Sequence, residues 1–146
     1  MRVSVHRSWP GVGETMVAGE TDLRRLLAGL DPLLHEDEYV FVTSRDRETP
    51  AGVEPVLVFE ETEGRTLVLP RAQAEKAGLD GVFPSAWITL RIHSSLEAVG
   101  MMAAVTAALA EAGISCNAVS AFYHDHLFVP RDRAGDAIAV LRDLAG

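Results

Sequence analysis

The chain has 146 residues, 48% of them hydrophobic, which is enough for one ordinary domain or two small ones with a packed core. Its net charge of −8, with Arg24 and Arg25 as the only adjacent basic pair, argues against a nucleic-acid surface, which needs clustered Lys and Arg. The most apolar stretch is too short to span a bilayer, Cys116 is the single cysteine, and the start of the chain lacks a signal-peptide core. We therefore expect a cytoplasmic protein without membrane or nucleic-acid partners.

The first half of the chain predicts a short helix followed by strands. Residues 1–20 alternate briefly and then become rich in glycine, which is typical of an N-terminal arm or an extra strand. Thr21 and Asp22 can cap a helix over 23–29, where leucines recur at helical spacing. The elements predicted after it are a strand at 39–43, a loop at 45–54, strands at 56–59 and 66–69 joined by a turn, and a helix opened by Pro70 and ended by Gly78.

The second half has a clearer pattern of strand, helix, strand, strand and helix. A strand around 87–93 alternates Ile88 and Leu90 with polar and aromatic neighbours. Ser94 or Ser95 is expected to cap an almost wholly apolar helix that runs to about Ala112. Such a helix must be covered on more than one side, so we expect a second domain or a second subunit to pack on it. Strands at 116–123 and 126–129 and a helix at 132–144 complete the chain.

The two halves share an internal repeat. Residues 66–77 and 126–137 are related by a shift of 60 and are identical at five of the twelve positions, and each copy reads as a strand, a Pro-Arg corner and a helix. We therefore predict two small α+β domains, each an antiparallel sheet with helices on one face, divided near residues 83–85. The first domain has no room for a full helix between Val42 and Pro55.

The serine corner from His93 to Gly100 joins a strand to the predicted helix and is the first candidate ligand site. Free backbone N–H groups and the helix dipole at a helix start suit a carboxylate. Gly100 leaves room there because it has no side chain. The alternative is a serine that only caps the helix, beside a glycine that only packs on a neighbouring element.

His124-Asp125-His126 is the second candidate. On a strand the two histidines share one face and Asp125 points to the other. Three interpretations stay open: a hairpin turn that uses Asp125 as a turn former, a metal site begun by His124 and His126, or a ligand site in which Asp125 pairs with an amine or a guanidinium. No third or fourth metal ligand has convincing spacing. Cys116 is interpreted as a small core residue.

The segments WITLRIHSSLEAVG, LAEAGISCN and SAFYHDHLFVP, supported upstream by EYVFVTS and TLVLPRAQAEKAGL, resemble bacterial tandem ACT-domain proteins related to the CASTOR arginine sensors. The resemblance implies two ferredoxin-like sandwiches in tandem: a degenerate domain at 21–83 and a complete one at 84–146, after the arm at 1–20. It also implies sensing of a small molecule, usually an amino acid, at the interface between domains. In the CASTOR-type sensors an acidic residue before the last strand helps to hold the amino acid, and Asp125 has that position here.

We therefore expect a regulatory module that binds an amino acid, forms a homodimer and is not an enzyme, with no catalytic residue, cofactor or metal. The alternatives are a dimerisation module without a ligand and, less favoured, a metal-dependent protein that uses His124 and His126. The residues predicted to contact the ligand are Ser94, Ser95, Leu96, Glu97, Val99, Gly100, Asp125 and His126.

Overall fold

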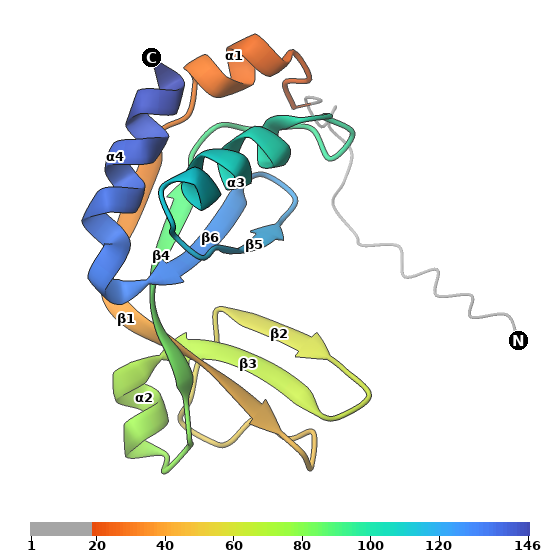
Figure 1. Ribbon diagram of the computed structural model, residues 1–146. Helices are drawn as coiled ribbons and strands as arrows, with labels where there is room; N and C mark the ends of the chain where they lie inside the picture. The colour runs from red at the N-terminus through yellow and green to blue at the C-terminus, as the bar shows by residue number, and fades with distance from the viewer. Residues whose placement is uncertain (1–18) are drawn as a thin grey trace, which may run out of the picture.

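The computed structural model describes residues 19–146, which form one six-stranded antiparallel sheet with the order β2-β3-β1-β4-β6-β5 (Figure 1). The part of the predicted arm at 1–18 lies outside the described residues. The elements in chain order are α1 (Leu23–Ala28), β1 (Pro32–Ser44), β2 (Leu57–Glu60), β3 (Arg65–Pro70), α2 (Arg71–Lys76), β4 (Val82–Leu90), α3 (Met101–Glu111), β5 (Asn117–Ser120), β6 (Asp125–Pro130), a 3-10 turn η1 (Arg131–Arg133) and α4 (Ala134–Ala145).

The sheet consists of two related halves. In the first half the strand order from the edge inward is β2-β3-β1, and in the second it is β5-β6-β4. The two halves therefore have the same strand order, counted from each edge to the central β1–β4 pair. β2 and β5, like β3 and β6, differ by 60 in residue number, as the sequence repeat predicts. The expected tandem of ferredoxin-like units is therefore present. The division predicted near Phe83 falls inside β4, because the two units share one continuous sheet.

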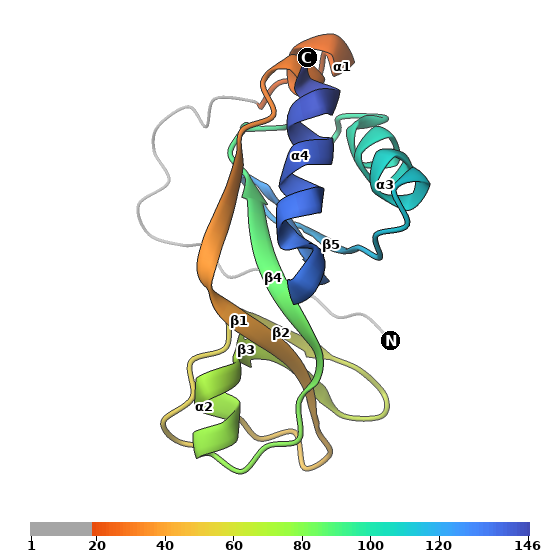
Figure 2. The same cartoon turned by 60° about the vertical axis from the view of Figure 1, so that its left-hand side comes forward.

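Helices cover one face of the sheet (Figure 2). In the second half, β4 and β6 direct Ile88, Leu90 and Leu127 into a core with α3 and α4, and all three are fully buried. Helix α1 belongs to the first half by sequence, yet its Leu26 is fully buried in this second core. The N-terminus of the first unit thus packs against the second, next to α3 and α4.

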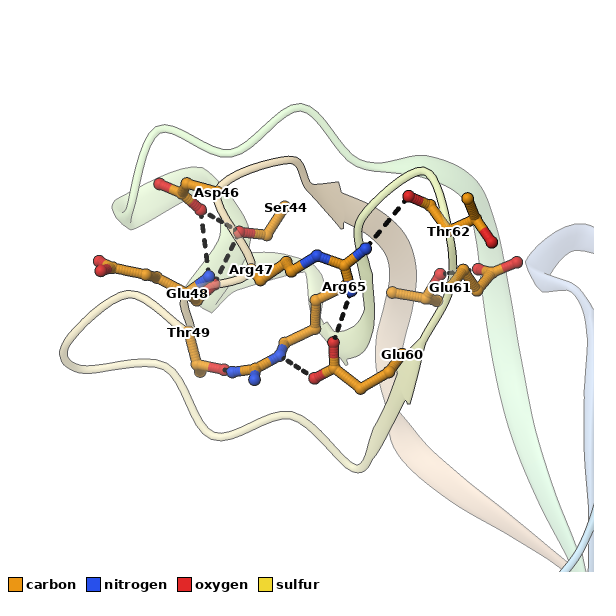
Figure 3. Close-up of polar contacts among 10 residues, drawn as sticks. Ser44, Asp46, Arg47, Glu48, Thr49, Glu60, Glu61, Thr62 and Arg65 are labelled. Atoms are coloured by element: carbon orange, nitrogen blue, oxygen red, sulfur yellow. Dashed lines mark hydrogen bonds and ion pairs between the residues drawn. The ribbon is translucent and has the colours of Figure 1, made fainter. Parts of the chain in front are cut away.

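The first half has a loop where the second half has α3. Residues 45–56 form turns and irregular backbone, as the absence of room for a helix predicts. Side-chain contacts hold this loop against the β2–β3 hairpin (Figure 3). The Glu60 carboxylate accepts from Arg47 at 3.3 Å and from Arg65 at 2.5 Å, and the Ser44 hydroxyl donates to Asp46 at 2.6 Å. The loop also adds Val53 to the small core of this half.

Two local expectations differ clearly from the structure. The strand expected at 39–43 is the end of the longer β1, which begins at Pro32 and pairs with both β3 and β4. Helix α3 begins at Met101, whereas capping by Ser94 or Ser95 predicted an earlier start. The segment between β4 and α3 is irregular because Glu20 pairs with it: the Glu20 N–H donates to the His93 carbonyl at 2.9 Å, and the Ser95 N–H donates to the Glu20 carbonyl at 3.0 Å.

Candidate ligand-binding site

A cavity of about 130 Å³ lies at the N-terminus of α3, in the second half of the chain. Its walls come from the segment after β4, the first turn of α3, the end of β5 and the start of β6. The lining residues are Ser94, Ser95, Leu96, Ala98, Gly100, Met101, Met102, Ala103, Ser120, Ala121 and Asp125. All of them lie between residues 94 and 125, so the first half contributes no described residue to the wall.

Asp125 is the buried acidic group of this cavity. It begins β6, where it pairs with Leu90 on one side and Ser120 on the other, and it is 5% exposed. Its carboxylate accepts hydrogen bonds from the Ser94 hydroxyl at 3.1 Å and from the Ser120 hydroxyl. The ion pairs within residues 19–146 all use other carboxylates. A buried carboxylate that meets only neutral donors favours a cationic group beside it.

The N-terminus of α3 supplies the opposite polarity. The first hydrogen bond of α3 runs from the Ala104 N–H to the Gly100 carbonyl at 3.0 Å. The amides of Met101, Met102 and Ala103 therefore have no acceptor within the helix. These three residues line the cavity that Asp125 also lines. Free amides and the positive end of the helix dipole suit an anion. The cavity therefore combines an anionic wall with a wall of backbone donors.

Gly100 serves the site in a different way from the one expected. It caps α3 with φ = 97°, in the left-handed region that favours glycine. A Cβ on Gly100 would lie 3.4 Å from the nearest atom, Cδ2 of Leu23, which is ordinary contact. The backbone conformation at the start of α3 therefore favours glycine at this position. The space beside Gly100 adjoins Leu23 of α1.

The structure brings together five of the eight predicted site residues. Ser94, Ser95, Leu96, Gly100 and Asp125 line the cavity.

The other three predicted site residues do not line this cavity. Glu97 and Val99 are exposed, because the segment between β4 and α3 is irregular and does not form the expected helical turn. His126 follows Asp125 on a strand, so its ring lies on the opposite face of the sheet. There its Nδ1 is 3.0 Å from the indole nitrogen of Trp87.

The histidine pair does not converge on a metal site. His124 precedes β6, and its Nδ1 lies 3.2 Å from the Ile92 carbonyl oxygen. The Nδ1 of His126 accepts from Trp87. Within the described part of the chain, no group of three or more His, Cys, Asp or Glu side chains could hold a metal ion. Nor is Asp125 a turn residue, because the hairpin turn spans 121–124 and Asp125 lies in the strand that follows.

Sequence reasoning missed Ser120 and the first turn of α3. Ser120 precedes Asp125 by five residues in a hairpin, and a four-residue turn places such residues opposite each other. This pairing register was the signal in the sequence from which Ser120 could have been predicted. The shift of the α3 start to Met101 had no such signal, because it depends on pairing with Glu20, which is distant in sequence.

Comparison with known proteins identifies the family. An ACT-domain family model matches residues 18–86, and a second ACT-domain model matches residues 82–143. A crystal structure of a Vibrio cholerae protein of unknown function, described as a possible transport protein, is 40% identical. The match covers 85% of this chain and 96% of that one, with a TM-score of 0.76. This chain belongs to the ACT-domain family.

More distant structures share the fold. The ligand-free regulatory subunit of aspartate kinase from Thermus thermophilus has a TM-score of 0.61 at 10% identity, and the match covers 80% of this ACT-domain chain and 97% of that chain. An Agrobacterium tumefaciens protein has a TM-score of 0.61 at 18% identity, with 80% and 89% of the two chains covered. No curated protein matches the chain. Among the described residues, no helix is both long and apolar enough to cross a membrane.

Proposed function

We propose that this tandem ACT-domain protein is a regulatory module that binds a small amino acid or a similar zwitterion in the Asp125 cavity. The observation that carries the proposal is the pairing of opposite polarities across one cavity. The buried Asp125 carboxylate suits a ligand amine, and the amides of Met101 to Ala103 suit a ligand carboxylate. These amides take the place of the backbone N–H groups of the serine corner, which the sequence alone suggested.

The volume of the cavity favours a small ligand. About 130 Å³ is slightly less than the roughly 150 Å³ of an apolar cavity known to hold benzene, which has six non-hydrogen atoms. Glycine, alanine and serine have five to seven non-hydrogen atoms, roughly this size. We therefore propose a ligand of this class, and a longer side chain would have to extend out of the cavity.

Binding rather than catalysis is proposed because the cavity holds serines and one carboxylate without a histidine or lysine base beside them. Cys116 does not supply a nucleophile either. Burial raises the pKa of its thiol to about 11, so the reactive thiolate is scarce at neutral pH.

We also propose that a second copy of the chain covers the rim of the cavity. Leu96 and Val99 are 66% and 83% exposed on one side of it, and Phe122 and Tyr123 in the β5–β6 turn are 47% and 56% exposed. A cluster of exposed apolar side chains is typical of an interaction surface. This rim replaces α3 as the reason for expecting a homodimer, because α3 already buries Met101, Val105 and Leu109 in its own core. Sedimentation velocity at micromolar concentration should find a dimer that Val99→Asp weakens; a monomer at all concentrations would exclude it.

Asp125→Asn tests the ligand site. A thermal-shift screen of the twenty amino acids should first find a small one that stabilises the wild-type protein, and calorimetry then gives its affinity. Asparagine keeps the shape of Asp125 and a hydrogen-bond acceptor but removes the charge. A charge-assisted hydrogen bond contributes about 1.5–3 kcal/mol, so affinity should fall on the order of 10- to 100-fold.

Glu97→Gln is the matched control, because it removes one carboxylate from the same loop without touching the cavity wall. Its affinity should equal that of the wild type. Equal affinity in Asp125→Asn, with an unchanged circular dichroism spectrum, would show that the ligand binds elsewhere. If no amino acid binds, the alternative of a dimerisation module without a ligand gains support.

A further inference from the structure

A second pocket lies on the face of the sheet opposite the Asp125 cavity. It has a volume of about 130 Å³ and is lined by Val56, Leu57, Trp87, Val119, Ala121, His126 and Phe128. Trp87 and Phe128 come from the central strands β4 and β6, while Leu57 and Val119 come from β2 and β5, the two edges of the sheet (Figure 1). No helix packs on this face among residues 19–146. The two edge strands thus wall a hollow whose floor is aromatic.

Contacts with neighbouring rings hold Trp87 in place on the floor of this pocket. His35 stacks on Trp87 with 3.6 Å between ring centroids and an interplanar angle of 10°. Tyr39 meets the Trp87 ring edge-on at 5.4 Å, and Phe128 lies 6.3 Å from it at a small angle. Phe128 is 2% exposed and Tyr39 is 5% exposed. The rotamer of Trp87 is therefore fixed from several sides before anything binds.

His126 gives this pocket one defined polar group. The indole N–H of Trp87 lies 3.0 Å from Nδ1 of His126, and an indole can only donate. Nδ1 must then be the acceptor, which puts the proton of the neutral imidazole on Nε2. Burial lowers the pKa of His126, which keeps the ring neutral at neutral pH. Within residues 19–146, Nε2 has no hydrogen-bond partner. The pocket therefore offers apolar walls and a single N–H donor.

We propose that this pocket is a second ligand site, separate from the Asp125 cavity, and that it takes a small neutral aromatic molecule that carries one carbonyl or ether oxygen. The aromatic ring would lie against Trp87 and Phe128 between the two edge strands. The oxygen would accept from Nε2–H of His126. A neutral ligand is favoured over a carboxylate because no arginine or lysine lines the pocket.

Acetophenone and ethylbenzene are the probes, because they have nearly the same shape and only acetophenone has an acceptor. Binding to the full-length protein is followed by ¹H–¹⁵N NMR of the Trp87 indole N–H, with Trp9→Phe to leave one indole signal. Both probes should shift this signal, and acetophenone should bind about three- to tenfold more tightly. His126→Met has no hydrogen-bond donor and keeps only a weak thioether acceptor for Trp87, so it should remove this difference.

Two variants that fill the pocket from opposite walls complete the test. Val119→Phe from β5 and Leu57→Phe from β2 should each abolish binding of both probes, and either one suffices if the other fails to fold. The proposal is overturned if neither probe shifts the indole signal, if both bind equally to the wild type, or if the shifts gather around Ser94 and Asp125. It is also overturned if Val119→Phe converts a dimer to a monomer, because the pocket would then belong to an interface between copies.

Discussion

Gly19→Ala should loosen the segment that forms the Asp125 cavity. A Cβ at this position would lie 2.5 Å from both the Ser94 carbonyl carbon and the Ser95 nitrogen, closer than real Cβ contacts, and backbone atoms cannot move aside as a side-chain tip can. The chain must separate there, which breaks the hydrogen bonds Glu20 N–H to His93 O and Ser95 N–H to Glu20 O. Each contributes about 0.5–1.5 kcal/mol, so the free energy of unfolding should fall by about 1–3 kcal/mol.

Urea unfolding measures this loss, and the melting temperature should fall by about 3–5 °C per kcal/mol. Hydrogen exchange of the Ser95 amide gives a local reading, because this amide donates to Glu20. Gly135→Ala is the matched control: it lies in α4 with nothing within 4 Å of its added Cβ, and should stabilise by about 0.5–1 kcal/mol. Unchanged stability and unchanged Ser95 protection in Gly19→Ala would refute the close approach as the constraint on this loop.

Three further predictions concern the core and the titrating groups. Leu109→Ala should lower the free energy of unfolding by about 2–5 kcal/mol in a urea titration, because this side chain is fully buried between α3 and the sheet. Cys116 should react with a thiol reagent at about pH 8 roughly a hundredfold more slowly than free cysteine, since burial raises its pKa to about 11; fast labelling of the native protein would contradict this. Burial lowers the pKa of His35 and His126 below the ordinary value of 6.5. At a pH below about 6.5 the unfolded chain therefore binds more protons than the folded protein. The free energy of unfolding should fall as the pH drops from 6.5 through the pKa values of the folded state. Unfolding curves at about pH 7.5, 6 and 5 should show this fall in the wild type and a smaller one in the variant His35→Gln/His126→Asn; equal falls would contradict it.

The fold could be predicted because patterns in the sequence indicate its strands and helices. Alternation in β4 and β6 separates Ile88 and Leu127 on the helix face from Trp87 and Phe128 on the other. Asp22 caps α1 as predicted, accepting from the Arg25 N–H at 2.9 Å. The repeat with a shift of 60 predicted the correspondence of the two halves. Alternation and capping depend on neighbours within a few residues, and the repeat needs only a comparison of two short segments, so none of these signals requires tertiary information.

The candidate site was only partly accessible from the sequence. Asp125 and Ser94 could be picked out as polar groups in apolar surroundings, and they do meet, at 3.1 Å. The sequence placed the helix start at the serine corner because a serine before an apolar run is a common helix cap, whereas the cap in the structure is Gly100. His126 was grouped with Asp125 although a strand sends adjacent side chains to opposite faces.

By itself the sequence determined the strand and helix order, the duplication and the two polar corners, because periodicity, capping and the likeness of two segments can all be read from short stretches of sequence. Only the tertiary structure decided that both units share one sheet, that α1 packs on the second unit, and that Glu20 draws the loop after β4 away from a helical start. The physical reason is that these outcomes rest on contacts between residues far apart in the chain. Such contacts decide where the free amides, the buried carboxylate and the aromatic floor lie, and local sequence propensities do not predict contacts of this kind.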